Sequence, residues 1–145
     1  MDKKFEDLQL ELASLVRYIT SLTPSQTGRM LDRSGFLILQ HIDSKGTASI
    51  KELATYFKLD ISTMSRQVRS LEQKDYLARR PNPSDKRAHF LTVTSSGKEQ
   101  LNAYRTLKSK RIQQLFGEWD EESLKQFTRL LQRANEEFRE NNWEE

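Results

Sequence analysis

The sequence contains no cysteine, and its 145 residues include only five glycines and three prolines. Without thiols the chain has no disulfide framework, no thiolate nucleophile and no Cys-ligated zinc. No apolar run approaches the roughly 18 to 20 residues that a membrane-spanning helix needs. The first residues also lack the basic-then-apolar pattern of a signal peptide. We therefore expect a cytoplasmic protein without a membrane partner.

Recognisable enzyme motifs are missing as well. The sequence has no Walker loop, nucleophile elbow, His-Glu-x-x-His pair or glycine-rich phosphate loop. His41 and His89 are the only histidines, and two isolated rings are more typical of packing than of metal ligation. A site made of histidine and carboxylates stays open as an alternative. We expect no catalytic residue, no cofactor and no metal.

The apolar residues that are present recur with helical spacing. Steps of three and four residues predict an amphipathic helix from about residue 5 to residues 21–24, followed by a loop over 25–32. Ser34 is expected to cap a second, short helix that is apolar on nearly all sides and therefore buried.

The next two helices are short and close together. Ser49 and Glu52 have capping-box spacing, which predicts a helix over 50–57. Asp60 is then expected to cap a helix over 61–73, whose apolar stripe consists of Met64, Val68 and Leu71. Two short helices joined by a tight turn are typical of a helix-turn-helix.

The period then changes to that of a β-hairpin. Residues 76–80 and 88–93 are predicted strands, and the prolines and polar residues of 81–85 predict the turn between them. Thr94 is expected to cap a long helix that Gly117 ends. Asp120 is expected to cap a last helix that reaches about residue 139, with Trp119 and Leu124 at the positions of a hydrophobic staple.

The net charge of +3 conceals a segregation of charge along the chain. Residues 58–98 carry nine basic and four acidic residues, whereas residues 118–145 carry four basic and nine acidic residues. A basic segment that coincides with a helix-turn-helix and a hairpin favours an anionic polymer as partner. Taken alone, the same charges are also typical of an ordinary solvated surface.

The residues of this basic segment carry a family resemblance. Residues 59–77 are similar to the recognition helix and first wing strand of the MarR family of bacterial transcriptional regulators, and residues 79–88 are similar to its wing. The pair Asp85-x-Arg87 matches the most specific wing motif of the family, and residues 93–97 resemble its strand-to-helix corner. Asp75 stands where the family usually has glycine, but aspartate tolerates a left-handed corner at modest cost.

The resemblance implies a mainly α fold with a small β-hairpin. It divides the chain into an N-terminal dimerisation helix and loop (1–33), a winged helix-turn-helix region (34–98) and C-terminal dimerisation helices (99–145). The implied function is that of a homodimeric regulator, a repressor by expectation, that binds a pseudo-palindromic operator in double-stranded DNA and is released by a small aromatic or anionic effector.

The candidate DNA contacts combine helix and wing. At 100° per residue, hydroxyls and guanidiniums gather opposite the apolar stripe of the 61–73 helix, where Arg66 is the best candidate for reading a base. At the wing, Asp85 is expected to hold Arg87 for the minor groove by a hydrogen bond from Arg87 or nearby backbone, unless Asp85 only starts a turn. One of Arg79 and Arg80 is expected to face DNA and the other to pair with an acid. The expected DNA contacts are Ser62, Thr63, Ser65, Arg66, Arg69, Arg79, Asp85, Lys86 and Arg87.

Two further expectations concern partners. The apolar stripes of the first and last two helices are longer than a chain of this size buries by itself, which favours a dimer; the alternative is that they close on each other within one chain. Trp143 is expected to be disordered or to pack on a partner chain. The residues considered for an effector cleft, with ordinary packing as the alternative, are Arg17, Tyr18, Phe36 and His41.

A winged helix that serves only as a protein-interaction module is the remaining alternative. Such a module would usually lose the basic character of its recognition face and wing, and both are retained here.

Overall fold

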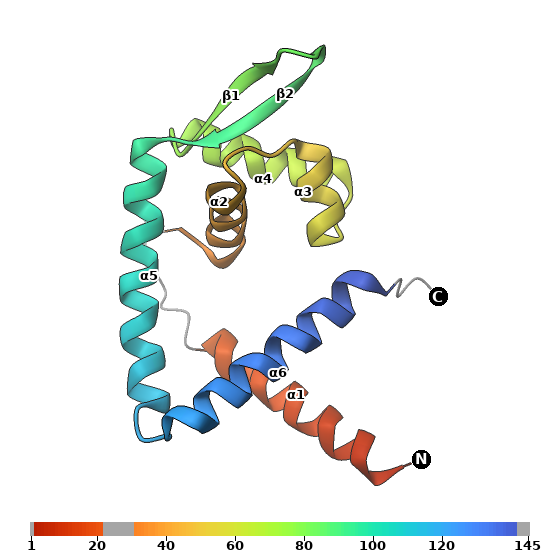
Figure 1. Cartoon of the computed structure of the whole chain (residues 1–145), viewed down its shortest axis with the longest axis vertical. Helices are drawn as coiled ribbons and strands as arrows, with labels where there is room; N and C mark the ends of the chain where they lie inside the picture. Colours follow the sequence, from red (N-terminus) through yellow and green to blue (C-terminus); the bar gives the residue numbers. More distant parts are fainter. Residues whose placement is uncertain (1, 22–30, 142–145) are drawn as a thin grey trace. The chain divides into compact units, whose positions relative to one another are not determined.

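The computed structural model describes residues 2–21 and 31–141, and within them the backbone forms helices and one hairpin (Figure 1). This confirms the expected mainly α fold with a small β-hairpin. None of the helices in these two ranges is both long enough and apolar enough to cross a membrane. The elements are α1 (Lys3–Ser21), α2 (Arg33–Lys45), α3 (Ile50–Phe57), α4 (Ile61–Gln73), β1 (Leu77–Asn82), β2 (Asp85–Val93), α5 (Ser95–Phe116) and α6 (Glu121–Glu140).

The chain divides into two compact units, residues 1–30 and residues 31–145. The first unit contains α1, which ends at Ser21, within the expected range. No residue of α1 is buried, and its apolar stripe, including Phe5, Leu8, Val16 and Ile19, is exposed. A helix of this kind depends on a partner surface, because packing of an apolar face supplies most helical stability in proteins.

The second unit has its core where α2, α3, α4 and the base of the hairpin meet. Helix α2 is the buried middle that its apolar sequence predicted, since Ile38, Leu39 and Ile42 are at most 2% exposed. They are joined by Leu53 of α3, and by a set of fully buried side chains from the other elements: Met64, Val68, Leu91 and Leu101.

The start of α2 differs from the expectation. Asp32, not Ser34, is the N-cap: Gly35 donates its backbone N–H to Asp32 Oδ1 at 2.7 Å, and the helix begins at Arg33. Aspartate and serine cap about equally well, so cap preference does not choose between them. Gly35 favours the Asp32 cap because it leaves room for the carboxylate: a Cβ at position 35 would lie 3.0 Å from Asp32 Oδ1.

The other predicted caps are confirmed. Ser49, Asp60, Thr94 and Asp120 each accept the backbone N–H of the residue three positions later. At Asp60, hydrogen bonds from the side chain and backbone of Thr63, and then from the Ser62 hydroxyl, lower the pKa from 3.8 to about 2. The start of α4 is therefore held by an ionised carboxylate.

The hairpin is longer than the sequence indicated. Its strands pair antiparallel from Leu77 opposite Val93 to Pro81 opposite His89, with a register shift after Pro81. The predicted turn over 81–85 contracts to Pro83 and Ser84, and Asn82 Oδ1 closes it by accepting hydrogen bonds from the Ser84 N–H and hydroxyl. Among the described elements, strand β1 pairs with β2 alone, so its other edge is free and proline is tolerated there, which is why Pro81 does not end the strand.

The base of the hairpin fits closely against the start of α5. Asp75 adopts the expected left-handed conformation, with φ at 64°. The Thr94 N–H donates to Tyr76 O at 3.1 Å, and the Thr94 hydroxyl donates to Asp75 O at 2.6 Å. A Cβ at Gly97 would lie 2.3 Å from Tyr76 O, so only glycine fits at this position. We call these four residues, Asp75, Tyr76, Thr94 and Gly97, the wing root.

The corner between α5 and α6 is aromatic. Phe116 and Trp119 meet edge to face at 5.0 Å between ring centroids, and Trp119 meets Phe127 in the same way at 5.6 Å. Gly117 follows the last residue of α5, as expected, with a right-handed φ of −64°. No residue of α6 is buried in the described chain. Trp143 lies outside the described residues.

Gly97→Ala tests the wing root. The added methyl group collides with backbone, which cannot rotate away as a side chain can, so we expect a loss of about 1–3 kcal/mol in the free energy of unfolding. Thermal and urea unfolding measure it, with Ser95→Ala, at an exposed position two residues earlier in the same helix, as the control. An unchanged unfolding midpoint would show that the close approach is absent.

Asp60→Asn tests the cap of α4. Asparagine caps a helix about as well as aspartate but does not titrate. Because the folded pKa of Asp60 lies below its ordinary value, the stability contributed by its charge is present above about pH 4 and lost as the pH falls toward 2. Urea unfolding of both proteins between pH 5 and 2 should show the advantage of the native chain shrinking. A constant difference would exclude a specific role for the carboxylate charge.

Candidate nucleic-acid interface

Helix α4 has the two faces that its sequence predicted. Met64, Val68 and Leu71 are buried against the core. On the opposite side Ser62, Arg66 and Arg69 are exposed, and Thr63 and Ser65 are half-buried. The core thus fixes which face of α4 is presented to a partner.

The exposed guanidinium of Arg66 is held by a neutral group. Its Nη2 donates to Thr63 Oγ1 at 3.3 Å, one helical turn away. The Ser62 hydroxyl donates to Asp60 Oδ1 at 2.8 Å and so belongs to the cap. Arg66 therefore keeps its positive charge at the surface, next to hydroxyls that can exchange their local bonds for bonds to a ligand.

At the wing tip, Asp85 orders the backbone. Its Oδ1 accepts the N–H of Arg87 at 3.0 Å, which is both the expected hydrogen bond and the geometry of an Asx-turn. The Arg87 side chain is exposed. Asp85 thus fixes where the Arg87 side chain leaves the hairpin and leaves its guanidinium available. The Lys86 side chain lies outside the described part of the structure.

The two arginines of β1 have different environments. Arg79 Nε donates to both carboxylate oxygens of Glu72 at 2.9 Å, and its Nη2 lies 2.9 Å from Glu72 Oε1. This confirms that one of the pair meets an acidic neighbour, and the ion pair joins the wing to α4. Arg79 can reach DNA only by breaking it.

Arg80 is exposed, so of the two arginines it is the one available to face DNA, although only Arg79 was among the expected contacts. The alternation of side chains in a strand contains the missing signal. Leu77 and Arg79 share one face of β1, and Leu77 is buried, so that face is turned to the helices. Arg80 lies on the other face, away from the core.

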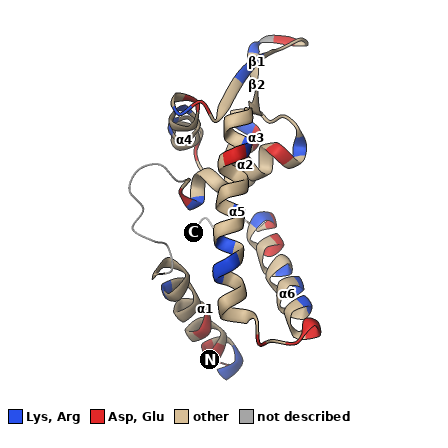
Figure 2. Cartoon of the chain, turned by 90° about the vertical axis from the view of Figure 1, so that its left-hand side faces the viewer, with Lys and Arg blue, Asp and Glu red and all other residues tan. Residues whose placement is uncertain are grey.

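Figure 2 shows Lys and Arg on α4, along β1 and near the hairpin tip, the parts of the second unit that carry these candidates. Acidic residues also occur there, but Asp60, Glu72 and Asp85 are all engaged in the cap, the ion pair and the turn just described. The acidic groups serve the architecture, and Arg66, Arg69, Arg80 and Arg87 remain exposed.

The candidate effector residues do not form one cleft. Phe36 stacks on Tyr104 at 4.3 Å between ring centroids, in a cleft of about 440 Å³ lined by α2, α5 and the start of α6. His41 stacks on Tyr56 at 4.0 Å and lines a different cleft. The two residues are five positions apart on α2, which turns them to opposite sides of the helix. Arg17 and Tyr18 are exposed on α1, in the first unit.

The Phe36–Tyr104 cleft has a cationic rim. Burial lowers the pKa of Lys108, and the neighbouring Arg111 and Arg33 lower it further. Burial also raises the pKa of the Tyr104 phenol, which stays neutral at physiological pH. Within residues 2–21 and 31–141, no group of three or more His, Asp or Glu residues is placed to hold a metal ion.

Comparison with known proteins agrees with this geometry. Residues 31–89 match the MarR family. The chain is 41% identical over 135 residues to the "Uncharacterized HTH-type transcriptional regulator YxaD" of Bacillus subtilis (strain 168), covering 92% of this chain and 94% of that protein.

Solved structures have the same fold. A crystal structure of MarR superposes with a TM-score of 0.76 at 26% identity, covering 90% of this chain and 89% of the other. Streptococcus pneumoniae FabT in complex with DNA superposes with a TM-score of 0.74 at 12% identity, covering 92% and 96%. The relatives are transcriptional regulators and not enzymes, which confirms the expectation of no catalytic role. With its winged helix-turn-helix and a relative matched over nearly its whole length, the chain belongs to the MarR family of transcriptional regulators.

Proposed function

We propose that this regulator acts as a homodimer in the bacterial cytoplasm and represses transcription by binding a pseudo-palindromic operator. The observation that carries the proposal is that the Arg79–Glu72 ion pair joins the wing to α4, so that two exposed cationic surfaces, the outer face of α4 and the wing tip, are linked. FabT, which has the same fold, is found with DNA. The expected DNA contacts remain those named from the sequence, with Arg80 added.

Each probe suits one groove of DNA. Helix α4 has the width and the polar face for the major groove, where Arg66 can bind guanine bidentately and Ser62, Thr63 and Ser65 can meet base edges or phosphates. Arg69 is suited to a phosphate. Arg87, at a tip whose backbone Asp85 fixes, is suited to a narrow minor groove, where the negative potential is enhanced.

A second copy of the chain accounts for the uncovered apolar stripes. On α6, Leu130 is 61% and Phe138 56% exposed, so the second unit does not close this stripe by itself. On α1, Val16 is 64% exposed. Pairing of these helices between two chains would bury both stripes, and the resulting two-fold axis would place two α4 helices about 34–36 Å apart, one turn of DNA.

An effector fits the proposal at the Phe36–Tyr104 cleft. Its stacked rings offer a surface for an aromatic ligand, and Lys108 offers positive charge for an anion. Helix α5 lines the cleft and also begins at the wing root. A ligand bound there would therefore change the distance between the wings of the two chains, and with it the fraction of dimers in the conformation that binds DNA.

Arg87→Ala tests the wing. Loss of a side chain inserted in the minor groove should weaken operator binding by about 1–3 kcal/mol, a factor of about 5 to 150 in Kd, with the fold and the dimer intact. Fluorescence anisotropy with a selected operator measures it. Arg129→Ala removes an arginine of α6 that is not among the proposed DNA contacts, and it should leave the Kd for the operator unchanged. Equal affinity of Arg87→Ala and the native chain would contradict the wing contact.

Salt dependence tests the function as a whole. The logarithm of the binding constant should fall linearly with the logarithm of salt concentration, with a slope of several units, because each phosphate contact releases counterions. The measurement is an anisotropy titration at several salt concentrations with the DNA upstream of the gene itself, alongside sedimentation analysis. A monomer that ignores DNA at low salt would leave the protein-interaction module as the function.

A further inference from the structure

One contact between α2 and α5 is a pair of stacked rings. Phe36 of α2 and Tyr104 of α5 lie 4.3 Å apart between ring centroids, with an angle of 15° between their planes. Apolar attraction of this kind has little direction, so the rings can slide and turn over each other. Packed helix pairs accordingly vary by about 15–20° in their crossing angle. The rings therefore hold the two helices together without fixing the angle between them.

One turn further along α2, a directional contact joins the same two helices. Gln40 Oε1 accepts hydrogen bonds from Arg105 Nε at 3.1 Å and from Arg105 Nη2. Nη1 of the same guanidinium donates to Asn102 Oδ1 at 3.1 Å, and its Nη2 lies 3.8 Å from Asp43 Oδ2. The guanidinium is planar and rigid, so acceptors on both helices fix its orientation. We call Gln40, Asp43, Asn102 and Arg105 the α2–α5 polar cluster.

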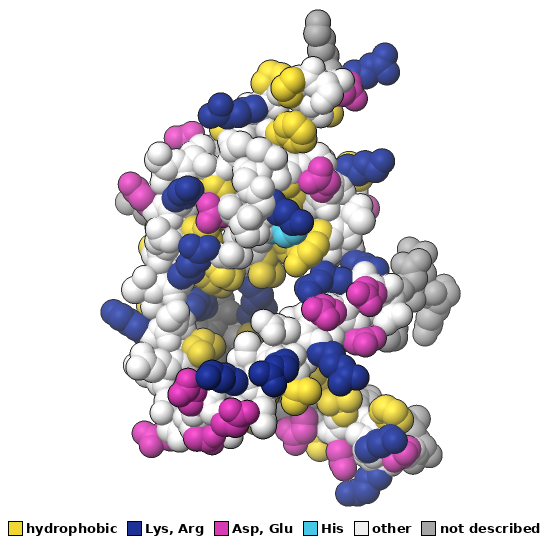
Figure 3. Space-filling view, viewed as in Figure 1, with side chains coloured by type: hydrophobic (Ala, Val, Ile, Leu, Met, Phe, Trp, Pro, Cys, Tyr) yellow, Lys and Arg dark blue, Asp and Glu magenta, His cyan; other side chains and the backbone are white. Residues whose placement is uncertain are grey.

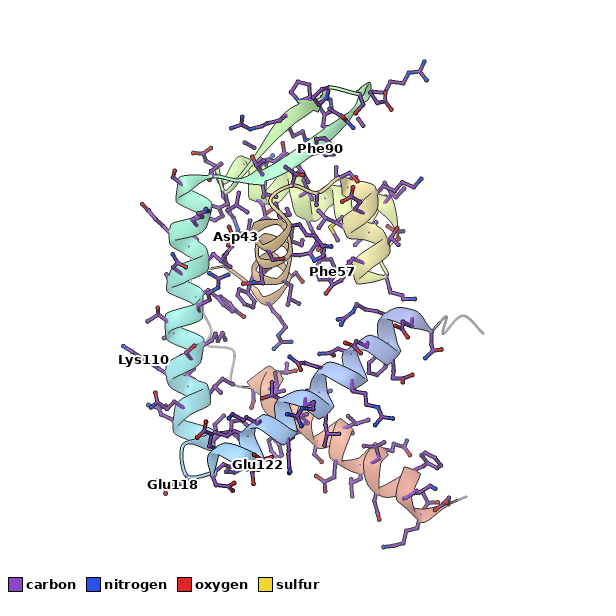
Figure 4. The ribbon with its side chains drawn as sticks, viewed as in Figure 1. Asp43, Phe57, Phe90, Lys110, Glu118 and Glu122 are labelled. Carbon is purple, nitrogen blue, oxygen red and sulfur yellow. The ribbon has the colours of Figure 1, made fainter. Side chains whose placement is uncertain are left out.

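The α2–α5 polar cluster is partly shielded from water. The side chains of Arg105 and Asp43 are 38% and 27% exposed, and Gln40 is half-buried. Figure 3 shows basic and acidic side chains side by side where α5 borders α2, and Figure 4 shows Asp43 on the side of α2 toward α5. Hydrogen bonds from an ionised donor are stronger than those between neutral groups. The cluster can therefore fix the angle that the stacked rings leave free.

The angle between α2 and α5 determines where the candidate DNA-binding surface of each chain lies. Helix α2 is the buried middle of the core on which α4 packs. Helix α5 leads to α6, which we expect to pair with a second copy. Because α5 has 22 residues and is about 33 Å long, a pivot of about 10° moves one of its ends by about 6 Å relative to the other. In a dimer, such a pivot would change the separation of the two α4 helices.

We propose that Arg105 is a positioning residue for DNA binding. Through Gln40 it fixes the angle between the winged helix-turn-helix region and α5, and thereby selects operators by the spacing of their half-sites. The inference rests on the proposed function, since it requires two chains on one operator. Arg105 donates to α2 and to its own helix and is not among the expected DNA contacts, so it acts through the position of the two binding surfaces.

The first test measures the dimer without DNA. The chain has no cysteine, so Lys51→Cys, at an exposed position of α3, places one spin label on each chain. Double electron–electron resonance then gives the distribution of distances between the two α3 helices. We expect a narrow distribution when Arg105 is present. With Arg105→Met it should widen by about 5 Å or more, because both chains gain the pivot.

The second test measures operator selection. Fluorescence anisotropy compares an operator of the preferred spacing with operators that have one base pair more or fewer, and with a single half-site. One base pair turns one half-site by about 35° relative to the other, so the native chain should lose at least about fivefold in affinity at either changed spacing. Arg105→Met should bind the three operators with nearly equal affinity, and its affinity for the single half-site should be that of the native chain.

Three further variants separate the hydrogen bonds from charge and packing. Gln40→Leu removes the acceptor and should behave as Arg105→Met does. Gln40→Glu keeps an acceptor oxygen and should keep the narrow distribution and the spacing preference. Lys98→Gln is the matched control, because Lys98 also lies 3.8 Å from Asp43 but is 63% exposed, and ion pairs so exposed contribute little. It should behave as the native chain.

Each outcome decides the proposal. A narrow distribution and a spacing preference that survive in Arg105→Met overturn it, and so does a native chain that binds all spacings equally. A variant that loses as much affinity for the single half-site as for the operator overturns it as well, since Arg105 would then only stabilise the fold. An equal effect of Lys98→Gln would assign the effect to charge and not to the hydrogen bonds.

The two tests also separate this inference from the proposed function. Failure of the native chain to bind any operator would overturn the proposed function, and the selection of spacing with it. Operator binding with a spacing preference that Arg105→Met retains would overturn this inference alone.

Discussion

The close approach of Gly97 to the Tyr76 carbonyl is the constraint on which the candidate DNA-binding surface, made of the exposed face of α4 and the wing, depends. A two-stranded hairpin is marginally stable by itself in water. Here its base is held by two hydrogen bonds from Thr94 to the backbone of residues 75 and 76, and this contact exists only because position 97 has no side chain. The antiparallel bridge between Ala48 and Leu91 holds β2 from the other side. The wing is therefore fixed to the core at its base, where a free hairpin would pivot.

The same contact makes α5 a connection between the wing and the rest of the second unit. Thr94 caps α5 and holds the wing root, so the helix begins where the hairpin ends. The helix is 22 residues long, about 33 Å at 1.5 Å per residue. Asp43 of α2 faces it, 3.8 Å from both Lys98 and Arg105 (Figure 4). At its far end, the aromatic corner of Phe116, Trp119 and Phe127 sets the direction of α6.

Most of the fold was predictable from the sequence because its signals are local. A capping residue, a stripe at three- and four-residue steps and an Asp-x-Arg pair each lie within a few positions, and the structure confirms the helices and four of the five caps. The errors arise where two local choices are equally good. Asp32 and Ser34 are both good caps, and only the fit of Gly35 against Asp32 separates them. Pro81 reads as a turn former unless the strand is known to have a free edge.

The site was harder to predict because it depends on which groups meet in space. Sequence alone shows that Arg79 and Arg80 are adjacent, but the bidentate pairing with Glu72 follows from how β1 lies against α4. Phe36 and His41 were considered for one effector cleft, with ordinary packing as the alternative, and in the structure they line separate clefts because α2 is covered on two sides. A helix that is buried on several faces has no single apolar stripe, so its sequence does not indicate which neighbouring element each side chain will face.

The distribution of carboxylates explains why some cations are available for binding and others are not. Glu72 binds Arg79 and Asp43 lies near Lys98 and Arg105, so these charges fix elements to each other. Arg66 is held by a hydroxyl, Lys58 by a carbonyl and Arg139 by an aromatic ring. A neutral partner orients a cation but leaves its field uncancelled, so an incoming anion gains the full interaction without displacing a carboxylate. By this criterion the exposed face of α4 is suited to an anionic polymer.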